Sequence, residues 1–451
     1  MKERLRAFLR AVRSSYWFIP SLMALTSVVL SVVMIWLDVR LGTSWMKGVS
    51  WYQQIRVDGA REVLSTIAGS MITVAGVVFS ITIVALSYAS SQYGPRVLTN
   101  FMTDRGNTVT LGTFIATFLY CLAILRTIRG GDHDFVPQLS VFVALLLAIC
   151  SIAVLIYFIH HVLQSIHINH VVARIGEQLV ADARHRFPDL IGDEPDDDGD
   201  MPALPARTWK TVRSDVTGYV QSIEQEHLLK LASDRDVLIR LRYRPGDFVM
   251  DGRGLVDVSP PERVDGTLCD ALRKCFTVGK KRTPDSDIMF LVSELVEIAA
   301  RALSPGVNDP MTAVTCLDWL GAGGSEFARR RLPRPVRVDE DGTPRVIAMP
   351  SGFAEFLEQS FGRLRHYAAT DMIAGLHFLR VLGELAAASR QQEQVRVIAD
   401  QAEWFAELAS EELSGADRNA VMTRSEQLQR LLMRQPRDIA EDQATWLGGS
   451  A

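Results

Sequence analysis

The sequence is short of cysteine and of net charge, and each shortage excludes a class of protein. Its 451 residues include five cysteines, none of them in a C-x-x-C pair. We therefore predict neither a zinc ribbon nor a disulfide framework, and we expect the soluble part to lie in a reducing compartment. The formal net charge is −4, without the basic excess typical of nucleic-acid-binding proteins, so no nucleic-acid partner is expected.

Sequence motifs of common enzymes are also missing. The chain has no P-loop, no G-x-S-x-G elbow, no H-E-x-x-H pair and no glycine fingerprint of a dinucleotide-binding fold. We therefore expect a protein that is not an enzyme and that carries no cofactor.

Long apolar runs are what the sequence does have, and all of them lie in the first third of the chain. Each is long enough to cross a lipid bilayer as a helix, and the first is too long for the core of a signal peptide. The four predicted spans are 17–37, 67–87, 109–128 and 136–160. Five Lys or Arg residues precede the first span. By the positive-inside rule they predict a multi-pass protein of the cell inner membrane with both termini in the cytoplasm.

The second span carries small and hydroxylated residues on one side. At 100° per residue they fall within an arc of about 120°. They are Thr66, Gly69, Ser70, Thr73, Gly76, Ser80 and Ser87, and the third span repeats the pattern weakly with Thr113 and Thr117. One interpretation is close helix packing, because small residues let backbones approach. The other is a water-lined pathway at the centre of a homo-oligomer, through which ions or small solutes pass.

Histidines gather where the fourth span ends. His160, His167 and His170 would lie near one face of a continuous helix, and the last two have a spacing that can hold a metal. No Asp, Glu or Cys nearby completes a ligand set, so they are weak metal candidates. Sensing of pH is a second interpretation, and a set of polar side chains at the membrane interface is the third.

The remainder of the chain reads as a soluble α+β region. Alternating strands and Gly-containing turns between 207 and 262 predict a β module that resembles a barrel-sandwich, although it lacks the lysine of a carrier domain. The predicted divisions are a membrane domain (1–165), a helix extension with an acidic linker (166–206), the β module (207–262), a helical segment with a small hairpin (263–351), a helical bundle (352–435) and a disordered tail (436–451).

Two groups of polar residues in this region could bind an anion. Arg240, Arg242 and Arg244 alternate along one predicted strand and share a face, which is either solvated or a basic surface for anions or lipid head groups. The second group surrounds a turn between two predicted helices. It comprises Glu294, Glu297, Arg301, Asn308 and Asp309. These residues either cap a helix–turn–helix corner or form a polar site at a helix N-terminus.

Several stretches together resemble one bacterial family. They are Tyr16–Pro20, STIAGSMITVAGVVFSITIVALSYASSQYGPR (65–96), DRGN (104–107), LGTF (111–114), YFIHH (157–161), RPGDFV (244–249) and RALSPGVNDPMTA (301–313). The chain resembles, from residue 14 to about 435, the predicted membrane proteins catalogued as domain of unknown function 2254. The resemblance implies four spans and a cytoplasmic domain, and it implies no substrate or activity.

The sequence thus predicts an integral membrane protein whose partner is the lipid bilayer. The first hypothesis is a channel-like homo-oligomer with the second span along its pathway. The alternative is a membrane-anchored sensor or assembly scaffold, whose cytoplasmic domain binds partners and which conducts nothing.

Overall fold

The computed structural model describes residues 17–41, 56–93, 105–129, 135–185, 208–283, 287–330, 335–434 and 439. The chain divides into two compact units, residues 1–170 and 171–451. The basic N-terminal tail, most of the predicted acidic linker and most of the predicted C-terminal tail lie outside the described residues.

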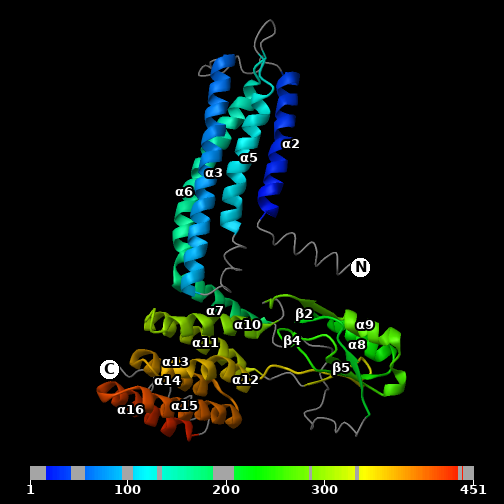
Figure 1. Ribbon diagram of the computed structural model, residues 1–451, viewed down its shortest axis with the longest axis vertical. Helices are drawn as coiled ribbons and strands as arrows, with labels where there is room; N and C mark the ends of the chain where they lie inside the picture. The colour runs from blue at the N-terminus through cyan, green and yellow to red at the C-terminus, as the bar shows by residue number, and fades with distance from the viewer. Residues whose placement is uncertain are drawn as a thin grey trace. The chain divides into compact units, whose positions relative to one another are not determined.

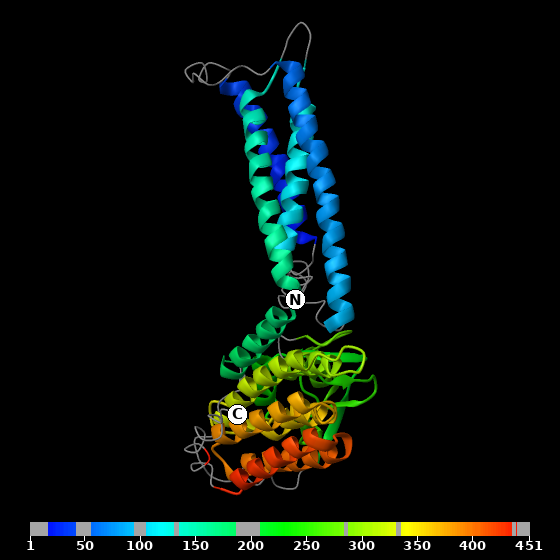
Figure 2. The same ribbon diagram turned by 90° about the vertical axis from the view of Figure 1, so that its left-hand side faces the viewer.

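In the residues that the structure describes, the first unit contains four long helices, which lie side by side as a bundle (Figures 1 and 2). They are α2 (Phe18–Leu41), α3 (Val57–Tyr93), α5 (Arg105–Leu125) and α6 (Gln138–Ile166). All four are long and apolar enough to cross a membrane, which confirms the four predicted apolar helices. The helix α3 has 37 residues, whereas about 20 suffice for a bilayer. It begins ten residues before the predicted span because Val57–Thr66 is a helix-forming segment that is too polar to count as apolar.

The helix α5 is the most buried of the four. Half of its apolar span is buried, compared with about a quarter in each of the others, and it packs against α2, α3 and α6. Tyr120 and Ile124 of α5 lie in one apolar cluster with Leu64 of α3, and Phe114 lies in a second with Met71 and Phe158. Burial of these side chains inside the bundle therefore positions the other three helices around α5.

Hydrogen bonds join the helices inside the bundle. The Ser27 hydroxyl donates to the carbonyl of Ala116, and the hydroxyls of Thr117 and Ser151 lie 3.1 Å apart. The Tyr120 hydroxyl donates to the carbonyl of Ser140 at 3.2 Å. Polar groups in a membrane interior need such partners, because lipid offers none.

The described residues of the second unit form two sheets. The larger has the strand order β1-β5-β3-β8-β7 and the smaller β4-β2-β6. The strands are β1 (Lys210–Arg213), β2 (Gly218–Ile223), β3 (Leu238–Leu241), β4 (Phe248–Val249), β5 (Gly254–Ser259), β6 (Phe276–Gly279), β7 (Val336–Val338) and β8 (Pro344–Ile347). Among the described residues these sheets are open and form no barrel.

The predicted hairpin around residues 336–347 forms, but it belongs to the larger sheet. The strand β8 pairs in parallel with β3, Ile239 lying opposite Val346, and β6 pairs with β2. The β structure therefore extends beyond the predicted 207–262 module, because strands from 276–279 and 336–347 complete its sheets.

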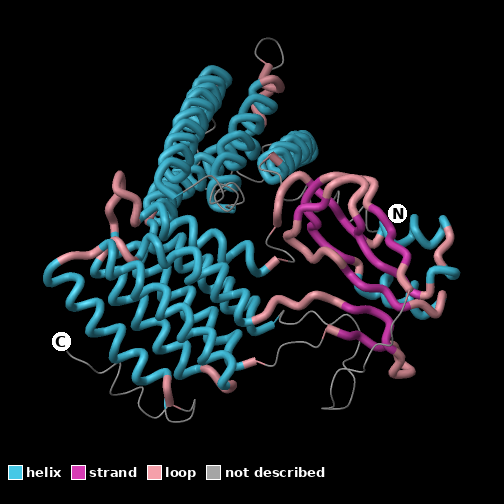
Figure 3. Tube along the Cα trace, turned by 60° about the horizontal axis from the view of Figure 1, so that its bottom comes forward, coloured by secondary structure: helices cyan, strands magenta, loops and turns pink. Residues whose placement is uncertain are grey.

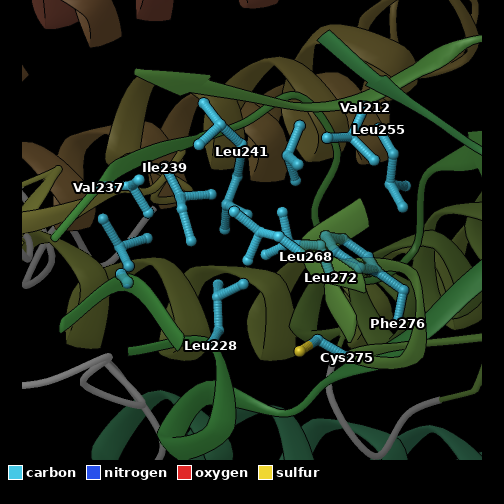
Figure 4. Packing of buried hydrophobic residues seen from close by; sticks show 14 of the residues in the cluster. Val212, Leu228, Val237, Ile239, Leu241, Leu255, Leu268, Leu272, Cys275 and Phe276 are labelled. Carbon is cyan, nitrogen blue, oxygen red and sulfur yellow. The ribbon is translucent and has the colours of Figure 1, made fainter. Parts of the chain in front are cut away.

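An apolar core lies on one side of the larger sheet (Figure 4). Ile239 and Leu241 of β3 contribute to it together with Leu228 of α8 (Gln225–Asp234) and Leu268 of α9 (Gly266–Lys274). Because side chains alternate along a strand, the neighbours of Ile239 and Leu241 lie on the opposite face.

Helices stacked side by side make up the rest of the second unit (Figure 3). They are α7 (Ile168–His185), α10 (Ile288–Ala302), α11 (Pro310–Arg329), α12 (Phe353–Leu357), a π-helical turn (Glu358–Gly362), α13 (Arg363–Ala368), α14 (Met372–Ala388), α15 (Gln392–Glu412) and α16 (Gly415–Leu432). The breaks between the last four of these helices lie near 370, 390 and 415. A close approach fixes α7 on α11, since a Cβ on Gly176 would meet the Trp319 ring at 2.2 Å.

Candidate functional site

The inward face of α3 is a regular apolar row. From Leu64 onward its buried residues recur at alternating intervals of four and three. They are Leu64, Ala68, Met71, Ala75, Val78, Thr82 and Ala85. This spacing keeps one side of a helix against its neighbours, so the packing of α3 inside the chain uses this row.

The stripe of small and hydroxylated residues lies on the opposite side of α3. Thr66, Gly69, Ser70, Thr73, Gly76, Ser80 and Ser87 are all exposed. The structure therefore places the seven predicted α3 residues together on one face, and that face points away from the chain's own bundle.

Three of the exposed hydroxyls of the stripe are bonded within their own helix. Ser70 donates to the carbonyl of Thr66 at 2.7 Å, Thr73 to that of Gly69 at 2.8 Å and Ser80 to that of Gly76 at 2.9 Å. Each hydroxyl proton is thereby used, while the oxygen lone pairs remain on the outer surface. The stripe is a row of oxygen acceptors.

Two further features shape this face. A Cβ added to Gly69 or Gly76 would meet nothing within 4 Å, so these glycines leave shallow, open places on the helix surface. Val77 and Val84 lie on the same face at 100° per residue and are 53% and 68% exposed. The outward face therefore alternates between oxygen-bearing and purely apolar levels.

The two threonines of α5 lie apart from this stripe. Thr113 is half-buried and donates to the carbonyl of Val109 at 2.9 Å. Thr117 is 1% exposed and faces Ser151 of α6. Thr117 therefore joins two helices inside the bundle and does not extend the outward face of α3.

The histidines do not form one face. The helix α6 ends at Ile166, and His167 has an extended conformation (φ −64°, ψ 123°) between α6 and α7. His160 lies 3.0 Å from the amide nitrogen of Gln164, and His170 is exposed on α7. Within the described ranges no three His, Cys, Asp or Glu side chains come together as a metal site.

Arg240 and Arg242 share one carboxylate. Asp257 lies opposite Arg240 in the sheet and accepts hydrogen bonds from both guanidinium groups. Burial alone would raise the pKa of Asp257, but hydrogen bonds from Arg242, Arg240 and Thr211 outweigh it, so the pKa lies below its usual value. Asp257 is therefore ionised at neutral pH, and the strand face carries a carboxylate shared by two arginines, which the sequence pattern of arginines alone did not reveal.

Arg244 forms no hydrogen bond with Asp257 and bonds instead to residues near α12. Its guanidinium donates to Glu355 of α12 at 2.6 Å and to the Ser351 hydroxyl at 3.2 Å. The next turn is just as tightly held, because Gly246 (φ +95°) lies against Asp287, where a Cβ would be 2.3 Å from a carboxylate oxygen. The motif Arg-Pro-Gly-Asp thus joins the β structure to the helices.

The corner between α10 and α11 is held by a helix cap. Asp309 accepts hydrogen bonds from the backbone and hydroxyl of Thr312, and Asn308 has a positive φ of 51°. On α10, Glu294 is 1% exposed, whereas Glu297 and Arg301 are half-buried. The geometry of Asn308 and Asp309 is that of a capped corner.

One carboxylate in the first unit, that of Asp38, was not predicted from the sequence to have a structural role. Asp38, near the end of α2, accepts hydrogen bonds from the backbone NH groups of Leu139 and Ser140, both at 2.9 Å, and from the Ser140 hydroxyl. It caps the first turn of α6 from 100 residues away in the chain. The sequence shows an acidic residue directly after the first apolar run, but it does not show which residues that carboxylate contacts.

Comparison with known proteins agrees with this architecture. The family model described as a predicted membrane protein, domain of unknown function 2254, matches residues 13–384. The chain belongs to this family. Uncharacterized proteins of Mycobacterium tuberculosis and Mycobacterium bovis are each 30% identical over 401 residues, covering 86% of this chain and 74% of theirs. No solved structure matches. The chain is thus a membrane protein of this family with four candidate spans.

Proposed function

We propose that copies of the chain assemble in the membrane and that their α3 helices line a pathway for ions or small solutes. The outward stripe carries this proposal. From Thr66 to Ser87 the face that no described helix of the chain covers bears small residues and hydroxyls, with Val77 and Val84 between them, where a lipid-facing span would be expected to carry bulky apolar side chains throughout. Small residues of this kind are typical of surfaces between membrane helices.

The chemistry of the stripe suits permeation. The oxygens of Ser70, Thr73 and Ser80 keep their lone pairs outward while their protons are bonded to the helix backbone. A ring of such oxygens from several copies replaces part of the water around an ion. Val77 and Val84 would form apolar rings between these levels, and apolar constrictions close a pore by excluding water.

We also propose, from the five basic residues ahead of the first span, that the protein lies in the inner membrane with both termini in the cytoplasm. This orientation places the second unit on the cytoplasmic side. Reporter fusions at each terminus test it, and activity of a periplasmic reporter at either end would contradict it.

The test of the pathway is ion flux through liposomes that contain the purified full chain. Ser80→Leu puts a bulky group on the stripe, and we expect flux to fall to the level of protein-free liposomes. Ile83→Leu, an exposed residue outside the stripe, is the matched control and should conduct normally. Val77→Thr conserves shape but adds a hydroxyl, so flux should rise. If the native chain passes no ion across a range of pH and membrane tension, the proposal fails.

One observation favours the second candidate, a non-conducting scaffold held together through α3. Because the hydroxyls of Ser70, Thr73 and Ser80 are bonded within the helix, this face can pack against another helix without water. In that case Ser80→Leu would disperse the oligomer while native liposomes stay impermeable.

A further inference from the structure

The face of the larger sheet that lies opposite its apolar core carries two arginines side by side. Ile239 and Leu241 point into the core (Figure 4), so Arg240 and Arg242 project from the other face. Their side chains are 43% and 48% exposed. Both guanidinium groups are therefore accessible to a ligand in water or at a membrane surface.

A single buried carboxylate fixes the two groups. Asp257 is 1% exposed, and one of its oxygens accepts from Arg240 Nη2 at 2.7 Å, Arg240 Nε at 3.1 Å and Arg242 Nε at 2.9 Å. Its other oxygen accepts from the Thr211 hydroxyl at 2.8 Å. The arginines are thus oriented before any ligand arrives, which lowers the entropic cost of binding.

The charge at this place is unbalanced. Two guanidinium groups share one carboxylate, which leaves an excess of one positive charge. A second group of ion pairs in the same unit has no excess charge, since two arginines, Arg345 and Arg263, are paired with two aspartates, Asp236 and Asp339. Each arginine has five N–H donors, and in the part of the chain that the structure describes only Asp257 is bonded to those of Arg240 and Arg242. Most of the donors remain available for an anion.

Neighbouring residues hold the planes of the two groups. The Arg240 guanidinium lies over the Trp209 ring, 4.5 Å from its centroid. Arg242 lies over Gly254, where a Cβ would be 3.3 Å from Nη1. Arg244 takes no part, because Glu355 and Ser351 already engage it.

We propose that Arg240 and Arg242 bind a phosphate group. Two planar forks held at a fixed separation suit the several oxygens of a phosphate, and guanidinium groups recognise phosphate through paired hydrogen bonds. The phosphate can belong to a lipid head group or to a soluble phosphate. This site is independent of whether α3 lines a pathway.

The experiment measures hydrogen–deuterium exchange in β1, β3 and β5 of the full chain in nanodiscs of phosphatidylcholine. In one arm, inorganic phosphate is titrated at constant ionic strength against chloride. In the other, phosphatidylglycerol, the same phosphate in an anionic lipid, replaces part of the phosphatidylcholine. Slower exchange in the first arm identifies a soluble phosphate, and slower exchange in the second arm alone identifies a lipid head group.

Variants test whether the two arginines cause the slower exchange. Arg242→Gln should weaken the effect about tenfold or more, because it removes charge-assisted hydrogen bonds. Arg242→Lys keeps the charge but loses the planar guanidinium group. The slowing of exchange in this variant should therefore be weaker than in the native chain and stronger than in Arg242→Gln. Arg380→Gln is the matched control, since Arg380 is 50% exposed and is paired with Glu384 on the surface; it should behave as native.

Melting of each variant without phosphate shows whether it folds. If Arg242→Gln does not fold, the response of exchange to phosphate is compared between Arg242→Lys and Arg380→Gln. The proposal is overturned if neither arm slows exchange in the native chain, or if a folded Arg242 variant responds as strongly as the native chain.

Discussion

Ser80 and Thr82 lie two residues apart on α3 and face opposite sides of it. Thr82 is buried against the bundle and donates to the carbonyl of Val78, whereas Ser80 is exposed and donates to that of Gly76. On α5, Thr117 contacts Ser151 of another helix. A hydroxyl side chain in this bundle therefore either joins two helices, as that of Thr117 does, or bonds to its own helix, whether it is buried like Thr82 or exposed like Ser80.

This difference between hydroxyls that join helices and exposed hydroxyls that do not indicates that the outer face of α3 is available for contacts between copies of the chain. Inside the bundle, Ser27, Thr117 and Tyr120 form hydrogen bonds with neighbouring helices. Among the described residues none packs on the stripe positions of α3, so substitutions there should leave one copy folded and change only how copies meet or what passes between them.

The largest expected effect compares two glycines. A Cβ on Gly112 would lie 2.6 Å from Met23 Sδ and 3.2 Å from the backbone of Pro20, whereas one on Gly76 meets nothing within 4 Å. Gly112→Leu should therefore destabilise the fold by about 3 kcal/mol through overpacking between α5 and α2. Gly76→Leu should leave the stability of one copy unchanged and weaken cross-linking between copies. Equal loss of stability in both variants, measured by unfolding in detergent, would refute the distinction between the two faces.

The next effect concerns the carboxylate inside the bundle. Asp38→Ala removes three hydrogen bonds at the start of α6, so we expect a loss of about 1–3 kcal/mol in the free energy of unfolding. Asp38→Asn keeps an oxygen acceptor and should lose less. The same unfolding titration measures both, and a stability of Asp38→Ala equal to native would show that the cap contributes nothing.

The smallest effect separates the two kinds of hydroxyl directly. Thr117→Val removes a bond between α5 and α6 and should cost about 0.6 kcal/mol, the average for such bonds in membranes. Ser80→Ala removes a bond within one helix on an exposed face, so its effect on the stability of one copy should be smaller still. Duplicate unfolding curves of both variants measure the difference. A larger loss in the free energy of unfolding for Ser80→Ala than for Thr117→Val would contradict this prediction.

Local patterns were enough to predict the four apolar helices and part of the β structure. Four apolar runs indicated the spans, and alternation around Arg240 together with Gly-containing turns between 207 and 262 indicated the β module, whereas β6 lies in a segment that was predicted to be helical. The seven stripe residues were predicted to share a face of α3, and they do. These features depend on residues close together in the chain, where periodicity and turn chemistry decide the structure.

Contacts between distant residues could not be predicted in this way. Parallel pairing of β3 with β8 joins Ile239 to Val346, and the cap on α6 joins Asp38 to Ser140. Periodicity also shows which residues share a face but not what the face meets. The sequence thus left open whether the stripe packs inside the chain, and the structure turns it outward.

The most direct test of the central claim is water accessibility along α3. Single cysteines at Ser70, Thr73, Ser80 and Ser87, in a chain whose native cysteines are replaced, are treated in membranes with an impermeant thiol reagent. Cysteines at Met71 and Val78, in the buried row, serve as controls. We predict labelling at the stripe positions and none at the controls. Protection of every stripe position across pH, salt and membrane tension would contradict a water-filled pathway.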